Sequence, residues 1–259
     1  YSFYCSIIQI CFILLLNQGN LKMTNRAICI STVRKNSQSV KKKNLLKIKG
    51  KPLFMHNIDY ALNSKLISSV HITTDININK KILIKKKIGY IKRPGNLCTS
   101  NASHFLTIKH AMNSIEKQGI EFDIVIVILG NSFGARTIDL DKGLKKLINN
   151  KKLDSVISVA KYNMYNPIRA YKKYKTSLLT NFFETKIIEK KIKNLSNINT
   201  KDAFNDVYFF NGSFWIIRKE IFLKNSGLPP FRYLGKNIGF IKQDPKFVEI
   251  DDKWQKKLF

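Results

Sequence analysis

Residues 122–129, FDIVIVIL, carry the most apolar strand pattern of this sequence. An unbroken run of Val, Ile and Leu is typical of a strand that is buried on both faces, as in a parallel sheet covered by helices. We therefore expect this strand at the centre of a sheet, with strand and helix patterns alternating around it. Strand patterns lie at 26–33, 68–75, 89–92 and 154–160, and helical patterns lie at 52–64, 76–87, 103–119 and 137–150. This alternation predicts an α/β fold with a mostly parallel, doubly wound, Rossmann-like sheet.

The alternation stops after residue 162. Residues 162–206 are less periodic and very basic, which favours a small arm or hairpin excursion from the sheet. Regular patterns return in 207–217, VYFFNGSFWII, and continue to the C-terminal stretch 237–254. Because no internal repeat and no Gly/Ser linker interrupts the chain, we expect 23–259 to form a single domain.

The first 22 residues differ from the rest of the sequence. Their apolar part is shorter than the roughly 20 residues that span a bilayer. They also lack the basic start and the small-residue cleavage site of a signal peptide. Met23 immediately precedes the first strand pattern. We interpret residues 1–22 as a non-native leader or translated upstream sequence rather than a membrane anchor, and we expect no membrane partner.

The chain is strongly basic, with 46 Lys and Arg against 17 Asp and Glu and a net charge of +29. Such a charge can indicate a nucleic-acid partner. It can also reflect the codon bias of an AT-rich gene, which enriches Lys, Asn, Ile and Phe together. The lysines are spread over every segment rather than gathered in one stripe, which favours the second explanation. We expect no specific nucleic-acid partner, although anionic substrates would still be attracted.

The cysteines and histidines indicate neither a disulfide framework nor a transition-metal site. Cys5, Cys11, Cys29 and Cys98 show no CxxC spacing, and the four histidines include no HExxH pair. A reduced, cytoplasmic setting is the expectation for such a pattern.

Residues 31–44, STVRKNSQSVKKKN, form a polar, basic loop directly after the first strand pattern. In open α/β sheets, ligands bind at the carboxyl ends of the strands. The segments STVRKNSQ, TTD and ILGNSFGAR all fall at such ends. The basic loop could therefore hold a phosphate, although it lacks the glycines that let backbone amides approach an anion closely. A solvated surface loop is the alternative.

The order of these segments resembles the cytidylyltransferase family that activates acidic sugars, the synthetases of CMP-N-acylneuraminate and their bacterial relatives. Arg34, Ser37, Lys43 and Asn44 match the family pattern Arg-x-Gly-Ser-Lys followed by Lys-Asn. Further matches are GKPL after this loop, ITTD, RPGNLCTSNAS, ILGNSFGART, VYFFNGSFWII and VEIDDKW, which keep the family's order from residue 26 to 258. Each match is weak alone, but their order over more than 200 residues is a strong indication of the fold.

The resemblance implies a sheet of the nucleotide-diphospho-sugar transferase type and a transfer of CMP from CTP. The acceptor would be a 2-keto-3-deoxy sugar acid such as an N-acylneuraminate-like nonulosonate, with release of pyrophosphate, for cell-surface glycan synthesis. Mg²⁺ would be the cofactor. The family also implies a homodimer, in which the excursion near 162–206 reaches the site of the partner subunit.

The resemblance also implies roles for individual residues. The triphosphate would be held by Arg34, Ser37 and Lys43. Asn44 would place the nucleotide. The cytidine pocket would be bordered by Arg93 and Ser103. Glu249 and Asp251 would bind Mg²⁺, because this hard ion prefers carboxylate oxygens. Asp75 and Asn211 would contact the sugar. Arg34, Lys43 and Asp251 are thus the candidate catalytic residues. Asp75 could instead cap a turn, and Asn211 with Gly212 could form only a turn or bulge.

The sequence departs from the family pattern in two places. The first place is the basic loop, where the family's glycines are replaced by Lys35 and Asn36 and its lysine by Gln38. The second follows the central strand, where a Gln-Pro pair is replaced by Gly130 and Asn131. The loop changes remove a phosphate-binding charge and restrict the approach of the backbone. A weakened enzyme, or a non-catalytic homologue that binds nucleotide or a polyanion, is therefore the alternative hypothesis.

Overall fold

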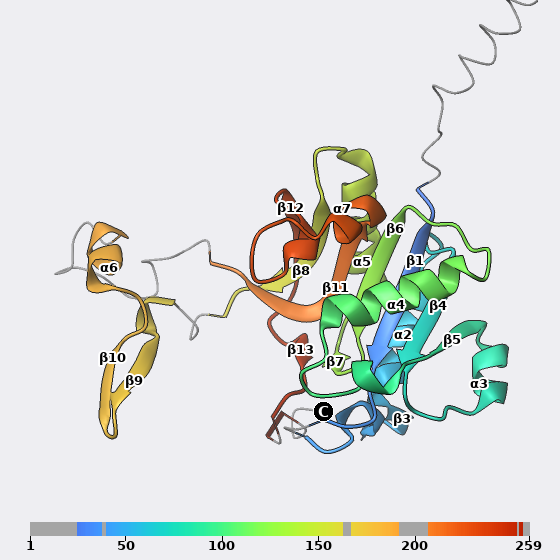
Figure 1. The fold of residues 1–259 in the computed structure, drawn as a ribbon, viewed down its shortest axis with the longest axis horizontal. Helices are drawn as coiled ribbons and strands as arrows, with labels where there is room; N and C mark the ends of the chain where they lie inside the picture. Colours follow the sequence, from blue (N-terminus) through green and yellow to red (C-terminus); the bar gives the residue numbers. More distant parts are fainter. Residues whose placement is uncertain (1–24, 38–39, 163–166, 192–206, 253, 256–259) are drawn as a thin grey trace, which may run out of the picture.

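The computed structural model describes residues 25–37, 40–162, 167–191, 207–252 and 254–255. Its centre is a seven-stranded sheet in the order β12-β8-β11-β6-β1-β4-β5 (Figure 1). The strands are β1 (Ala27–Val33), β4 (Ser69–Thr74), β5 (Ile88–Lys92), β6 (Ile124–Leu129), β8 (Ser155–Ala160), β11 (Phe209–Arg218) and β12 (Ile238–Lys242). The predictions for residues 1–22 and Gln38 concern residues outside the described part.

The predicted parallel sheet is confirmed, with one reversed strand. β6 lies in the middle of the order, pairing parallel with β1 and antiparallel with β11. β11 also runs antiparallel to β8, whereas the pairs β1–β4, β4–β5 and β8–β12 are parallel. β6 is buried along nearly its whole length, as its continuous apolar sequence predicts.

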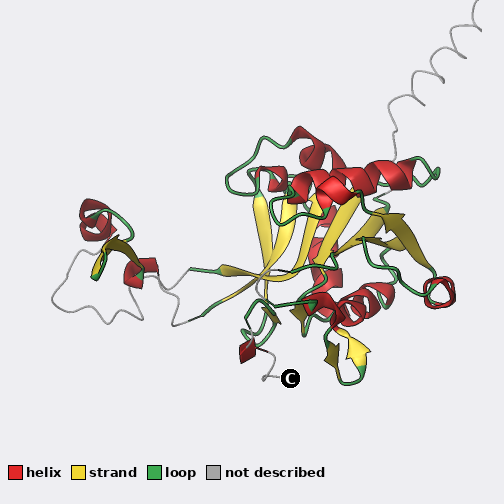
Figure 2. Cartoon of the chain, turned by 60° about the horizontal axis from the view of Figure 1, so that its bottom comes forward, coloured by secondary structure: helices red, strands yellow, loops and turns green. Residues whose placement is uncertain are grey.

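Helices cover both faces of this sheet (Figure 2). On one face, Ile124, Ile126 and Ile128 of β6 join an apolar cluster with α2 and α5. On the other face, Val125 and Val127 join a cluster with α4 and α7. Successive strand residues point to opposite faces, so a strand between two helical layers must be apolar at every position. The helices are α2 (Leu53–Leu62), α3 (Lys80–Lys85), α4 (His104–Glu116), α5 (Thr137–Asn149) and α7 (Lys219–Lys224).

Two short strand pairs lie beside the carboxyl edge of the sheet. β7 (Ser132–Phe133) pairs antiparallel with β13 (Val248–Glu249), and β2 (Lys47–Ile48) pairs with β3 (Lys51–Pro52). The sequence patterns did not predict β7, which is only two residues long. The β7–β13 pair brings the C-terminal acidic stretch next to the end of β6.

The excursion predicted after residue 162 contains a hairpin in its described part. β9 (Tyr171–Lys175) and β10 (Leu178–Asn181) pair antiparallel, and α6 (Thr185–Lys191) follows them. Figure 1 shows these elements apart from the sheet. Several of their apolar side chains are exposed, among them Tyr171, Tyr174, Leu178, Leu179 and Phe182.

Among the described residues, every helix is too short or too polar to cross a lipid bilayer.

Candidate active site

A pocket of about 290 Å³ opens at the carboxyl edge of the sheet, where the sequence placed its candidate ligand site. Its walls come from the loop after β1, the segment between β5 and α4, the end of β6, and the stretch around β13. The lining residues are Thr32, Arg34, Lys43, Asn44, Arg93, Leu97, Thr99, Ser100, Ala102, His104, Thr107, Leu129, Asn131, Glu249 and Asp251. Segments separated by up to about 200 residues therefore meet in one pocket.

The loop after β1 supplies the cations on one side of the pocket. The Arg34 guanidinium Nη1 donates to the backbone oxygen of Thr99 at 3.2 Å, which directs this side chain toward the segment after β5. Asn44 Nδ2 donates to the backbone oxygen of Arg34 at 2.8 Å and so holds the two ends of the loop together. Asn44 is buried, and its Oδ1 has no hydrogen-bond partner among the described residues. This oxygen is itself buried, close to Gly130 at the end of β6.

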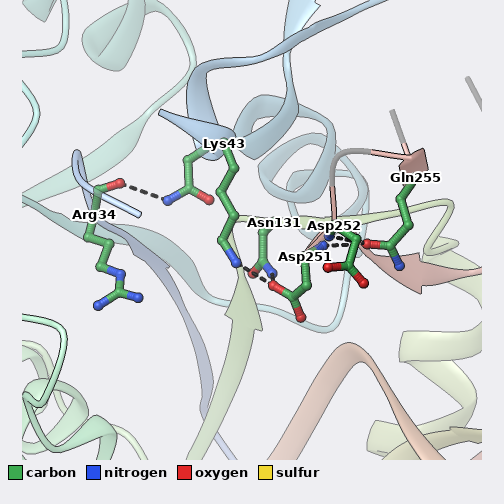
Figure 3. A network of polar contacts seen from close by, with 7 residues as sticks. Arg34, Lys43, Asn131, Asp251, Asp252 and Gln255 are labelled. Carbon is green, nitrogen blue, oxygen red and sulfur yellow. Dashed lines mark hydrogen bonds and ion pairs between the residues drawn. The ribbon is translucent and has the colours of Figure 1, made fainter. Parts of the chain in front are cut away.

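The acidic side of the pocket is built around Asp251 (Figure 3). The Lys43 ammonium forms an ion pair with Asp251 Oδ1. Asn131 Nδ2 donates to the same oxygen at 3.1 Å. The backbone amides of Asp251 and Asp252 both donate to Gln255 Oε1 at 2.6 Å, which fixes the turn after β13. Asp251 thus faces the pocket with its side chain half exposed to solvent.

Glu249 is the more deeply placed of the two acids. Burial, and after it the negative charge of Asp251, raises the pKa of its carboxyl to about 7. Lys43 and a hydrogen bond from Asn131 oppose this rise. Two carboxyl groups this close together create a local excess of negative potential, which favours a bound cation.

Gly212 makes room for Glu249. It follows Asn211 in β11 with a φ of +77°, and a Cβ built on it would lie 2.1 Å from Glu249 Cγ. Asn211 itself is buried and donates to Gln243 Oε1 at 2.8 Å. Gly212 therefore leaves space for the acidic wall, whereas Asn211 contacts Gln243 and is not among the residues that line the pocket.

Replacing Gly212 with alanine should displace Glu249 and destabilise the fold. Gly119 provides a matched control, because it has the same φ of +77° but no atom within 4 Å of its Cβ position. Both variants incur the cost of a left-handed backbone, about 1–2 kcal/mol. Gly212→Ala should lower the free energy of unfolding by about 1–3 kcal/mol more than Gly119→Ala, because the new methyl group overpacks the site. Urea unfolding measures the difference, and equal losses in the two variants would contradict this role of Gly212.

Arg93 and His104 form a further wall of the pocket. Arg93 is only 7% exposed and donates from Nη2 to the backbone oxygen of Thr73 at 2.7 Å. Burial lowers its pKa, while Cys98 and Asp75 act in the opposite direction. Burial and the charge of Arg93 lower the pKa of His104 to about 4, so this ring is neutral at pH 7. The positive charge of this wall therefore comes from Arg93.

The pocket unites most of the predicted site residues. Arg34, Lys43, Asn44, Arg93, Glu249 and Asp251 all line it. Four predicted residues are not among its lining residues: Asn211, Ser37, Ser103 and Asp75. Ser37 is half-buried in the loop, and Ser103 caps α4 by accepting from the backbone amide of Leu106 at 3.3 Å. Asp75 accepts from the backbone amide of Lys35 at 2.7 Å and lines a separate cavity of about 580 Å³ beyond Arg93.

The sequence patterns missed several lining residues. Asn131 was noted only as a departure from the family pattern, and His104 only as a helix residue without a metal-binding partner. Thr99 and Ser100 lie in a segment that was matched to the family as a whole. The position of Asn131 directly after the central strand was the available signal, because ligands gather at such strand ends.

The acidic wall fits a magnesium ion. In the described part of the chain, no three His, Cys, Asp or Glu side chains are grouped so that they could hold a metal ion. Mg²⁺, however, usually binds through one or two carboxylates together with phosphate oxygens and water. Glu249 and Asp251 offer two carboxylates of this kind. The Lys43 ammonium in contact with Asp251 shows that this wall already attracts positive charge.

Comparison with known proteins shows the family of this chain. The family model described as cytidylyltransferase matches residues 28–223. The chain belongs to the cytidylyltransferase family. It is 24% identical to an N-acylneuraminate cytidylyltransferase of Escherichia coli, covering 91% of this chain and 52% of that protein. It is 25% identical to the post-translational flagellin modification protein B of Campylobacter coli, covering 89% of this chain and 92% of that protein. This chain therefore spans about half the length of the first relative and nearly all of the second.

Solved structures agree on the fold. The structure of CMP:2-keto-3-deoxy-manno-octonic acid synthetase complexed with CTP superposes with a TM-score of 0.62 at 16% identity, covering 90% of this chain and 96% of that chain. A 4-diphosphocytidyl-2C-methyl-D-erythritol synthase from Anaerococcus prevotii superposes with a TM-score of 0.58 at 13% identity, covering 92% of this chain and 99% of that chain. These similarities confirm the nucleotidyltransferase type of α/β fold that the sequence predicted.

Proposed function

We propose that this protein transfers CMP from CTP to a 2-keto-3-deoxy sugar acid of the N-acylneuraminate type and releases pyrophosphate. The observation that carries the proposal is the pocket itself. In a chain of the cytidylyltransferase family, it gathers three cations, Arg34, Lys43 and Arg93, with the acids Glu249 and Asp251. The name of the E. coli relative, N-acylneuraminate cytidylyltransferase, supports a sugar acid as the acceptor.

In the proposed reaction, the anomeric hydroxyl of the sugar acid attacks the α-phosphorus of CTP. A bond forms between this oxygen and the α-phosphorus, the bond from the α-phosphorus to the bridging oxygen of the β-phosphate breaks, and pyrophosphate leaves with the bonding electrons. The hydroxyl proton is released. Little covalent chemistry is required of the protein in such a transfer, so positioning and charge stabilisation dominate.

The pocket residues can supply both effects. Arg34 presents a planar guanidinium to the phosphate oxygens, and Lys43 adds a point charge next to it. Arg93 and Asn44, which both line the pocket, would fix the nucleoside end. A divalent metal held by Glu249 and Asp251 would offset the charge that develops on the phosphates.

Pyrophosphate release tests the proposal. The protein is incubated with CTP, Mg²⁺ and each of neuraminic, legionaminic, pseudaminic and octulosonic acids. We expect release with at least one acid and none with CTP alone. CTP binding without release for any acid would instead support the non-catalytic homologue.

The proposal also includes a cytoplasmic setting and a homodimer. The free thiols of Cys29 and Cys98 agree with a reducing compartment. The dimer is supported by exposed apolar side chains in the hairpin β9–β10, where Tyr174 is 64% exposed and Leu179 is 69% exposed. A monomer rarely exposes a cluster of large apolar side chains of this kind unless a partner covers it.

A charged side chain introduced into this hairpin should separate the two subunits. We expect sedimentation to show a dimer for the native protein and a monomer for Leu179→Lys, because a lysine at a buried contact would lose its hydration. Ile84→Lys provides the matched control: Ile84 is 76% exposed but lies in α3, outside the hairpin, and the variant should stay dimeric. A native protein that sediments as a monomer at working concentration would contradict the dimer.

A further inference from the structure

Asn131 contacts the acidic stretch through both its backbone and its side chain. Its backbone oxygen accepts from the amide of Ile250, which stands between the two acids, at 2.8 Å. Its Nδ2 donates to Asp251 Oδ1 at 3.1 Å (Figure 3). The Asn131 side chain also donates a hydrogen bond to the Glu249 carboxyl, and this bond opposes the rise in the pKa of that carboxyl. One buried residue thus contacts both acids and the chain between them.

Asn131 is itself held firmly against the central strand. Asn57 of α2 donates from Nδ2 to the backbone oxygens of Leu129 and Ser132, each at 2.7 Å, so the turn around Asn131 is tied at both ends. Directly beyond it, Ser132 pairs with Glu249 in the β7–β13 ladder. The contacts to the acids therefore start from a rigid point of the fold rather than from a mobile loop.

We propose that Asn131 is a positioning residue that holds Glu249 and Asp251 in the arrangement that binds a divalent cation. This inference rests on the metal site of the proposed function. Two neighbouring carboxylates repel each other, and an amide that donates to them offsets part of this repulsion and restricts their rotamers. Hydrogen-bond partners of metal ligands commonly change metal affinity about 10- to 100-fold when they are removed.

Binding of Mn²⁺ alone, followed by electron paramagnetic resonance without nucleotide or sugar, tests the role. Asn131→Ala removes the amide, and Asn131→Leu removes it while keeping the side-chain volume. We expect both variants to raise the Kd for Mn²⁺ about 10- to 100-fold. In turnover assays, both should need more Mg²⁺ but recover most of their rate when it is saturating.

Ser132→Ala is the matched control. Ser132 Oγ donates to the backbone oxygen of Leu129 at 3.2 Å, so this variant disturbs the same turn without removing a hydrogen bond to the acids, and it should keep the native Mn²⁺ affinity. An unchanged Kd in the Asn131 variants, or an equal loss in Ser132→Ala, would overturn the positioning role and leave the metal site standing. If the native protein binds no Mn²⁺, the inference fails together with the metal site, whereas CMP transfer is judged separately by pyrophosphate release.

Discussion

Asp251→Asn should lower turnover roughly 100-fold or more while the protein stays folded and still binds CTP. An amide keeps the shape of the side chain but supplies no negative charge to a divalent cation. Metal ions contribute several kcal/mol of charge stabilisation in such reactions, and each 1.36 kcal/mol corresponds to a factor of ten in rate. Because the Asp251 side chain is 52% exposed, its neutralisation should not disturb the core.

Two further variants make this result specific. Asp252→Asn is the matched control: it neutralises the next residue, which shares the Gln255 contact but does not line the pocket, and its turnover should remain native. Glu249→Gln should lower turnover by the same factor as Asp251→Asn or by a smaller one. Steady-state kinetics and circular dichroism measure turnover and folding. Full activity in a folded Asp251→Asn variant would contradict the assignment of Asp251 to the metal.

Arg34→Ala should weaken the use of CTP about 10- to 100-fold. Hydrogen bonds between charged partners are worth on the order of 1.5–3 kcal/mol, and about 1.4 kcal/mol corresponds to a factor of ten. Arg34 also anchors the loop after β1 to Thr99, so the variant would lose this restraint on the pocket wall in addition to the proposed phosphate contact. The effect should appear in kcat/KM for CTP and in direct CTP binding.

Arg26→Ala is the control for general charge. Arg26 precedes β1, at the opposite end of that strand from the pocket, and pairs there with Glu121 at 2.7 Å. Its removal lowers the net charge by the same amount as Arg34→Ala. If both variants weaken CTP binding equally, the chain attracts CTP only through its overall positive charge, and the loop after β1 is no phosphate site.

The loop after β1 explains how a phosphate site could work without glycine. The backbone amide of Lys35, which a glycine-rich loop would offer to a phosphate, donates here to Asp75. Lys42 adopts a left-handed φ of 54°, a conformation that glycine usually provides. The positive charges that face the pocket are therefore the side chains of Arg34 and Lys43 rather than backbone amides.

The sheet could be predicted from sequence because each strand carries its own signal. The unbroken apolar run of β6 follows from burial on both faces, and the helices between the strands show their own periodicity. The reversed direction of β11 has no local signal, because a strand with two buried faces has the same apolar pattern whether it runs parallel or antiparallel. The two-residue strand β7 is too short to show a period.

The site could be predicted only in part for a related reason. Lys43 and Asp251 are 208 residues apart in the chain, and only the fold brings them into contact. The family pattern located these residues, but it could not show that Asn131 joins the two acids or that Asn211 supports Gln243 instead of lining the pocket. Such contacts depend on how strand ends are placed relative to one another, which no short sequence motif records.

The most direct test of CMP transfer is ³¹P nuclear magnetic resonance of CTP incubated with the protein, Mg²⁺ and the best sugar acid from the panel. The account predicts that the CTP signals are replaced by equal amounts of pyrophosphate and a CMP phosphodiester, and only when the sugar acid is present. Unchanged CTP with every acid, or conversion of CTP to CDP and phosphate, would contradict it.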